Sequence, residues 1–61
     1  MTAEQIDKAL QQHGGRVIGK HRDQWGFIVE GVILERDGDH VLIDSYTNKV
    51  ELSKVISIRH I

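Results

Sequence analysis

The stretch Phe27-Ile28-Val29-Glu30-Gly31-Val32-Ile33-Leu34 decides the fold of this chain. It is rich in β-branched and aromatic residues, which favours a strand over a helix. In an extended chain its apolar side chains fall on both faces, with Ile28, Val32 and Leu34 opposite Phe27, Val29 and Ile33. A half-buried strand alternates apolar with polar residues instead. We therefore expect a helix, a neighbouring subunit, or both to cover the second face.

Two glycine signals shape the chain around this strand. Gly31 interrupts the apolar run, which predicts a sharp bend or the close approach of another backbone. Downstream, Arg36-Asp37-Gly38-Asp39 contains the Asp-Gly pair that is typical of a tight hairpin. The apolar stretch Val41-Leu42-Ile43 follows as the returning strand.

The regions on either side complete the pattern. Thr2 and Gln5 form a Ser/Thr-x-x-Glu/Gln capping box, and apolar residues at helical spacing follow until Gly14-Gly15, so we predict a helix over residues 3–13. A strand begins at Val17-Ile18, and the polar residues 20–26 are interpreted as a loop or a strand end. About five short strands over residues 16–61, separated by turns, are typical of a small barrel or sandwich.

Length and composition limit the class of protein. The chain has 61 residues, of which 39% are hydrophobic and 28% charged, without cysteine or proline. We predict one domain over residues 1–61, with neither disulfides nor thiolate metal sites. The absence of a long apolar window and of a signal-peptide pattern predicts a cytoplasmic protein with no membrane span. A domain of this size buries only about 60% of its unfolded surface, so we expect it to associate with itself.

The order of elements resembles that of Sm-like proteins, including the bacterial Hfq type. The stretch Gly26–Ile33 is similar to the first Sm motif, G-x-x-h-x-G-x-h, where h is hydrophobic. Asp37 stands where the family has an acidic residue near a turn, and Lys54–Ile58 is similar to the final strand pair. The match spans about residues 5–59. It implies a mainly β, five-stranded SH3/Sm-like barrel with a short N-terminal helix, assembled as a homo-oligomer.

The same resemblance bears on RNA. Hfq-type proteins bind uridine-rich RNA with a Tyr-Lys-His element, but Leu52-Ser53-Lys54 stands at those positions here. On the opposite face the family stacks adenines near the first glycine of the motif, and this chain has Trp25 and Phe27 there, which are not the family's residues. The resemblance therefore implies a barrel and an oligomer more strongly than it implies an RNA ligand.

The charge distribution suggests where a nucleic acid would bind. Residues 13–22 carry three basic residues and no acid, residues 45–61 carry a second basic excess, and residues 23–44 are acidic. The lone Trp25 lies beside the first basic segment, and an aromatic next to basic residues is typical of single-stranded nucleic-acid binding. The predicted nucleic-acid-binding residues are Arg16, Lys20, Arg22, Trp25, Lys54 and Arg59. The alternative is that Trp25 caps the barrel or fills a subunit contact, and that the charges only keep the surface solvated.

The remaining hypotheses concern partners and chemistry. Apolar residues of the second face form the predicted oligomer interface: Ile28, Val32, Leu34 and Leu42. The leading hypothesis is a homo-oligomeric single-stranded RNA-binding protein, and the alternative is a protein-interaction or assembly module. We expect no enzyme, cofactor or metal, because the four histidines lack ligand spacing and the carboxylates suit turns. The SH3-like type II dihydrofolate reductases place Val-Gln-Ile-Tyr where this chain has Val50-Glu51-Leu52-Ser53, without the glutamine and tyrosine.

Overall fold

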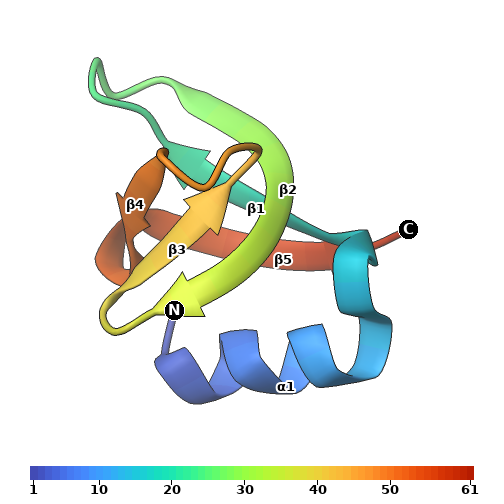
Figure 1. Cartoon of the computed structure of the whole chain (residues 1–61). Coiled ribbons are helices and arrows are strands. Elements are labelled where there is room, and N and C mark those ends of the chain that lie inside the picture. Colours follow the sequence, from blue (N-terminus) through green and yellow to red (C-terminus); the bar gives the residue numbers. More distant parts are fainter.

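The computed structural model describes all 61 residues, Met1 to Ile61. One helix precedes a five-stranded antiparallel sheet with the strand order β4-β3-β2-β1-β5 (Figure 1). In chain order the elements are α1 (Ala3–His13), η1 (Gly14–Arg16), β1 (Val17–Arg22), β2 (Ile28–Asp37), β3 (His40–Ile43), β4 (Lys49–Glu51), η2 (Leu52–Lys54) and β5 (Val55–His60). The chain is mainly β, as the strand pattern predicts.

The helix confirms the capping signal at its N-terminus. The Thr2 hydroxyl accepts a hydrogen bond from the backbone N–H of Gln5, and the Gln5 side chain accepts one from the backbone N–H of Thr2. These two bonds satisfy amide donors that the first turn leaves without partners. The predicted helix over residues 3–13 is confirmed, and it ends at Gly14, whose φ of 57° favours glycine.

β1 extends further than the polar sequence suggested. Residues 20–22 were expected to lie in a loop or at a strand end, but Lys20 pairs with Glu30 and Arg22 pairs with Ile28 across the sheet. The cross-strand partner supplies the backbone hydrogen bonds, so local polarity does not end the strand. β1 also pairs with β5 on its other side, which makes it one of the three inner strands of the sheet.

β2 is the longest strand and bends through a wide arc, which brings β3 and β4 round toward β5 (Figure 1). The close approach expected at Gly31 is made by side chains and not by another backbone, because an added Cβ there would lie 2.5 Å from the Asp44 Oδ2 and the Ile43 Cγ2 atoms. Asp44 caps the bend. Its Oδ1 accepts the N–H of Val32 at 2.8 Å, and its own N–H donates to the Val32 carbonyl at 2.8 Å.

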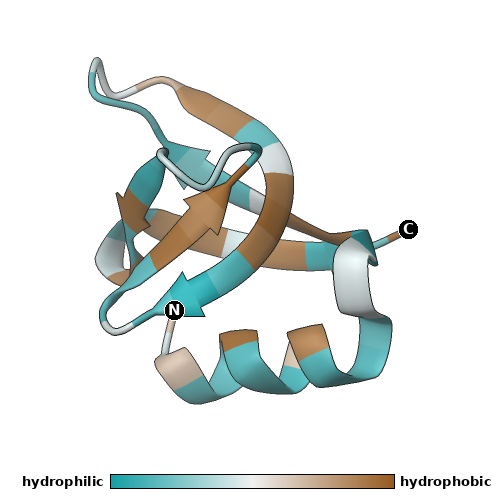
Figure 2. Cartoon of the chain, in the orientation of Figure 1, coloured by the Kyte–Doolittle hydropathy of each residue, from teal (hydrophilic) through white to brown (hydrophobic).

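The core lies on the inner side of the bent sheet, where the apolar strand segments face α1 (Figure 2). The fully buried side chains come from the helix and three different strands: Ile6, Val17, Ile33, Val41 and Ile43. Ala3, Ala9 and Leu10 of α1 pack against this cluster. The helix therefore covers the inner side of the sheet, and the outer side of β2 has no such cover within the chain.

Candidate interaction surface

The loop between β1 and β2 is held by hydrogen bonds that converge on Asp23. The Oδ1 of Asp23 accepts the backbone N–H groups of Trp25 and Phe27, both at 2.9 Å. The N–H of Asp23 donates to the Phe27 carbonyl at 2.9 Å, and the N–H of Gly26 donates to the Asp23 carbonyl at 3.1 Å. Arg22 Nη1 adds a bond to the Gly26 carbonyl at 3.0 Å. The loop backbone is thus constrained without any core contact.

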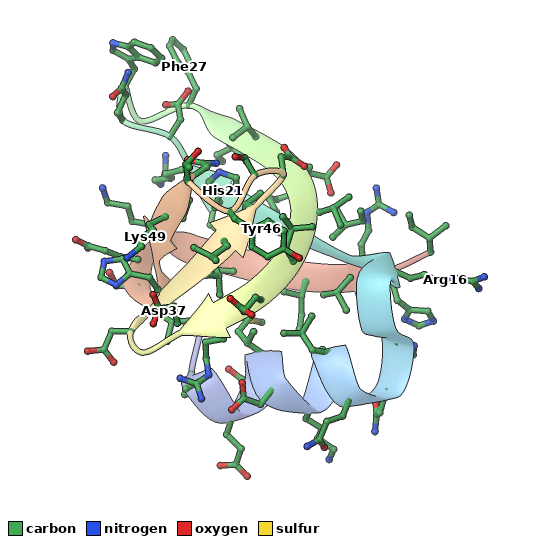
Figure 3. The ribbon with its side chains drawn as sticks, viewed as in Figure 1. Arg16, His21, Phe27, Asp37, Tyr46 and Lys49 are labelled. Carbon is green, nitrogen blue, oxygen red and sulfur yellow. The ribbon has the colours of Figure 1, made fainter.

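This constrained loop holds two aromatic side chains in solvent. Trp25 is 74% exposed and Phe27 is 68% exposed, and Phe27 stands at the outermost tip of the molecule (Figure 3). Ile28 and Val29, at the start of β2 next to this loop, are also exposed, one on each face of the strand. We call residues 23–27 the aromatic loop. Scattered apolar side chains are normal on a surface, but a contiguous patch of them marks an interaction site.

A hollow of about 470 Å³ lies at the base of the aromatic loop, between the ends of β1 and β2 and the β4–η2 segment. We call it the loop hollow. Glu30 in its lining is paired with Arg59, and the remaining carboxylates, Asp23, Asp44 and Glu51, still outnumber the cations Arg22 and Lys54. Its potential therefore disfavours phosphate groups and favours cationic or neutral polar groups.

His21 also lines the loop hollow. Its side chain is buried, with 6% of the residue exposed, and its Nδ1 atom has no hydrogen-bond partner in the chain. A buried polar atom without a partner costs about 1–3 kcal/mol, so such atoms are rare in stable cores. The Nδ1 atom of His21 is the only buried side-chain nitrogen or oxygen in the molecule that lacks a hydrogen-bond partner. The least satisfied part of the interior therefore lies next to the aromatic loop.

Three of the six predicted nucleic-acid-binding residues come together in the structure. Arg22, Trp25 and Lys54 all line the loop hollow, although they come from β1, the aromatic loop and η2. Arg22 and Lys54 are both exposed to solvent. Trp25 does not pack on its own chain, so of the two packing alternatives only a role in a contact between subunits stays open.

The other three predicted residues lie elsewhere. Lys20 and Arg59 share a smaller hollow on the outer side of β1 and β5, together with Glu30. Arg59 Nε donates to Glu30 Oε2 at 3.1 Å, which offsets its charge. Arg16 lies in η1, at the end of β1 opposite the aromatic loop, and points away from the molecule (Figure 3). The predicted basic residues therefore do not form one continuous surface.

The four predicted interface residues differ in their accessibility. Ile28 is 54% exposed, and Val32 and Leu34 are half-buried, so a partner has apolar surface to contact there. Leu42 is only 5% exposed, because β3 is covered on both faces within the chain. Leu42 is therefore a buried residue of the folded chain and not an interface residue, contrary to the expectation.

The ion pair between Asp7 and Arg36 fixes the helix to the sheet. Arg36 Nε and Nη2 donate to the two Asp7 carboxylate oxygens at 2.6 and 2.8 Å. The hydrogen bond from Arg36 lowers the pKa of Asp7 below its ordinary value of 3.8, against a smaller opposing effect of desolvation. The same bond raises the pKa of Arg36. Asp7 and Arg36 thus serve as each other's partners in a structural ion pair, and neither lines the loop hollow.

Most residues that line the loop hollow were not predicted from the sequence as site residues, among them Asp23, Val29 and His21. A signal for the loop was present, because Asp23 and Gly26 occupy the first and last positions of a turn, where Asp and Gly are preferred. The φ of 84° at Gly26 fits that glycine. The burial of His21 was not predicted, because residues 20–26 were interpreted as a loop or a strand end; in the observed strand Lys20 and Arg22 point to the face opposite His21.

No group of three or more His, Asp or Glu side chains is placed to share a metal ion. None of the helices has the length and apolar character that crossing a bilayer requires. No protein-family model, curated protein or solved structure matches the chain. The resemblance to Sm-like proteins therefore stays a prediction from the motif residues.

Proposed function

We propose that this chain is a non-catalytic, cytoplasmic protein-docking module on an SH3/Sm-like barrel, with the aromatic loop as its contact surface. One observation carries the proposal. Hydrogen bonds to Asp23 constrain a loop whose two aromatic side chains, Trp25 and Phe27, remain in solvent. Aromatic residues on a preorganised backbone are typical of binding hot spots, because little ordering is required when the partner arrives.

The barrel assignment is supported by the order of elements. One short helix, a long bent strand with Gly31 at its tightest contact, and further short strands follow one another as in the Sm-like layout that the sequence resembles. The tight Asp37-Gly38 turn after β2 agrees with that layout. The proposal goes beyond the observed five-stranded sheet and takes it to close into a barrel. The loops at the two ends of such a barrel would then be its accessible ligand surfaces.

Charge favours a protein partner over a nucleic acid. Single-stranded nucleic-acid sites combine aromatic residues with a positively charged groove. Around Trp25 the carboxylates of the loop hollow outnumber Arg22 and Lys54, and the whole chain has a formal net charge of -1. A protein side chain that is apolar, or apolar with a basic neighbour, fits this surface better than a phosphate backbone.

Single-stranded RNA remains the second candidate, supported by Arg22 and Lys54 beside an exposed indole. Its binding would weaken steeply as salt rises, because each phosphate contact releases counterions. Docking of an apolar protein segment would change little with salt. The homo-oligomeric RNA-binding protein and the protein-docking module therefore differ in a measurable way.

Selection of peptides from a displayed random library on the immobilised chain tests the proposal. Trp25 is the only tryptophan, so its fluorescence reports directly on peptide or oligoribonucleotide binding. We expect selected peptides to bind Phe27→Ala at least tenfold more weakly, since a hot-spot truncation costs about 2 kcal/mol or more. Trp25→Ala should lose binding similarly when binding is followed by calorimetry.

Tyr46→Ala is the matched control, because Tyr46 is an aromatic residue with 65% exposure in a different turn. It should leave peptide affinity unchanged. Equal losses for Tyr46→Ala and Phe27→Ala would contradict a specific role of the aromatic loop. Selection of no peptide, together with tight and salt-sensitive binding of oligoribonucleotides, would replace the proposal with the RNA candidate.

A further inference from the structure

A second accessible site lies between α1 and β5, on the opposite side of the molecule from the aromatic loop. It is a groove of about 330 Å³. Ala9, Val17 and Ile58 give it an apolar floor, since Val17 is buried and the other two are half-buried against the core. We call it the helix groove.

The rim of the helix groove is basic or neutral throughout. Lys8 and Gln12 lie one turn apart on α1, and Arg59 on β5 carries a further positive charge that Glu30 partly offsets. No carboxylate side chain lines the groove. The acids of α1 are kept off this side, because Glu4 and Asp7 line a different surface and Asp7 is bonded to Arg36.

One end of the helix groove is closed by a pair of stacked imidazoles. The rings of His13 and His60 are 3.8 Å apart between centroids and nearly parallel, at 3°. They join the last turn of α1 to the end of β5, and both line the groove. Flat rings next to an apolar floor suit an aromatic side chain, which packs by offset stacking or edge to face.

The helix groove and the aromatic loop are complementary in charge and in apolar character. The loop presents two exposed aromatic rings above a hollow in which carboxylates are in excess. The groove presents an apolar floor and an aromatic end within a basic rim. Aromatic rings would meet the floor and the imidazoles, while the carboxylates of the loop hollow would face Lys8 and its neighbours.

The loop of a chain cannot enter the groove of the same chain. The aromatic loop projects from one end of a molecule whose longest extent is 31 Å, and α1 lies at the other end (Figures 1 and 3). The bonds to Asp23 and Arg22 hold the loop in that direction. The occupant that satisfies both charge and geometry is the loop of another molecule.

We propose that the aromatic loop of one copy docks into the helix groove of a second copy, so that copies associate head to tail. The inference rests on the proposed function, since it names the partner of the same loop. A head-to-tail contact uses two different surfaces, so an open assembly keeps one free loop at one end and one free groove at the other until a ring closes. It does not use pairing between sheet edges.

Two variants that each damage one surface test the inference by complementation. The loop variant is Trp25→Ala with Phe27→Ala. The groove variant is Lys8→Glu with Gln12→Glu, which reverses the charge at one exposed rim position and adds a negative charge at the other while keeping good helix formers. Gln11→Glu is the matched control, because it adds a carboxylate to an exposed position of α1 that does not line the groove.

Sedimentation and native mass measurement over a wide concentration range provide the readout. We expect the wild type and Gln11→Glu to form multimers, and each of the two double variants alone to be at least tenfold weaker in self-association. An equimolar mixture of the double variants should form pairs of one copy each and nothing larger, since one intact loop meets one intact groove. That pairing is possible only for two different, complementary surfaces.

Three results would overturn the inference. One is a monomeric wild type at high concentration, and another is unchanged self-association of either double variant. The third is a mixture that fails to pair although circular dichroism shows both variants to be folded. Any of these leaves the proposed function to its own test, because peptide binding at the loop is measured on a single immobilised copy. Loss of both peptide binding and self-association on Phe27→Ala would support the two together.

Discussion

Two connections of the sheet expose an aromatic residue, and they differ in what their hydrogen bonds support. In the β3–β4 connection, which exposes Tyr46, Asp44 bonds across to Val32 of β2, while further bonds among Ser45, Thr47 and Asn48 stay within the turn. In the aromatic loop, the Asp23 bonds stay within the loop and hold Trp25 in solvent. A connection that stabilises the sheet needs no further explanation, whereas one that stabilises exposed aromatics points to a partner.

The largest expected effect is on the first connection. Gly31→Val places side-chain atoms where a Cβ alone would lie 2.5 Å from Asp44 and Ile43, so the β2–β3 contact must open. Overpacking of this kind costs about 1–3 kcal/mol. For a domain of this size, with a stability of roughly 3–9 kcal/mol, that is a large fraction. Urea unfolding measures it.

Gly15→Ala is the control for this change, because an added Cβ there meets nothing within 4 Å and the backbone is not in the left-handed region. It should change the free energy of unfolding by less than about 0.5 kcal/mol. If Gly31→Val were equally mild, the Asp44 cap would not depend on the close packing of the Asp44 and Ile43 side chains against the backbone of Gly31.

A smaller effect on stability is expected in the second connection. Asp23→Ala removes the acceptor of two exposed backbone N–H groups, which costs about 0.5–1 kcal/mol because water replaces part of the bonding. Peptide affinity should fall about tenfold, since the loop must then be ordered on binding. Hydrogen exchange of the Trp25 and Phe27 amides should become faster.

Asp23→Asn separates geometry from charge in this connection. The Asn side-chain carbonyl can accept the same two N–H groups, so exchange protection and affinity should largely return. If Asp23→Asn behaved like Asp23→Ala, the negative charge of Asp23 and not the loop conformation would be the feature that the partner recognises.

The smallest expected effect lies outside both connections, at the Asp7–Arg36 pair. The pKa of Asp7 is lower in the folded chain than its ordinary value of 3.8, so folding favours the ionised carboxylate. The pair's stabilisation is therefore complete above that value and is lost as the pH falls through the lower folded pKa. Asp7→Asn should lower stability slightly near neutral pH and weaken its acid dependence. Unfolding curves at several pH values would show this, and an unchanged acid dependence would contradict it.

Much of the fold followed from local signals. The Thr2–Gln5 capping box and the spacing of Ile6 and Leu10 predicted the helix, because capping and helical periodicity act over a few residues. The Asp37-Gly38 turn was predicted for the same reason, whereas the side chains of Ile43 and Asp44 that approach Gly31 come from a distant part of the chain and were not predicted. The extent of β1 was not, because Lys20 and Arg22 depend on partners in β2.

The candidate site was predicted less completely. Trp25 was identified because an aromatic beside basic residues is conspicuous in a sequence, but its neighbours in space come from other strands and include the carboxylates of Asp44 and Glu51. The grouping of basic and acidic residues along the sequence does not show which side chains share a surface in the folded chain. The stack of His13 on His60 joins residues from the two ends of the chain, and no spacing rule predicts it.

The sequence by itself determined the kinds of element, the positions of the helix cap and turns, and an excess of apolar side chains on the central strand, since these depend on neighbours within a few residues. Only the tertiary structure decided that Leu42 is buried and Ile28 is not, that His21 lies beneath the aromatic loop, and that a basic groove and an acidic hollow lie apart. The burial of a side chain and the electrostatic potential at a surface both depend on residues that are distant in the chain. They are therefore fixed only once the strands have paired.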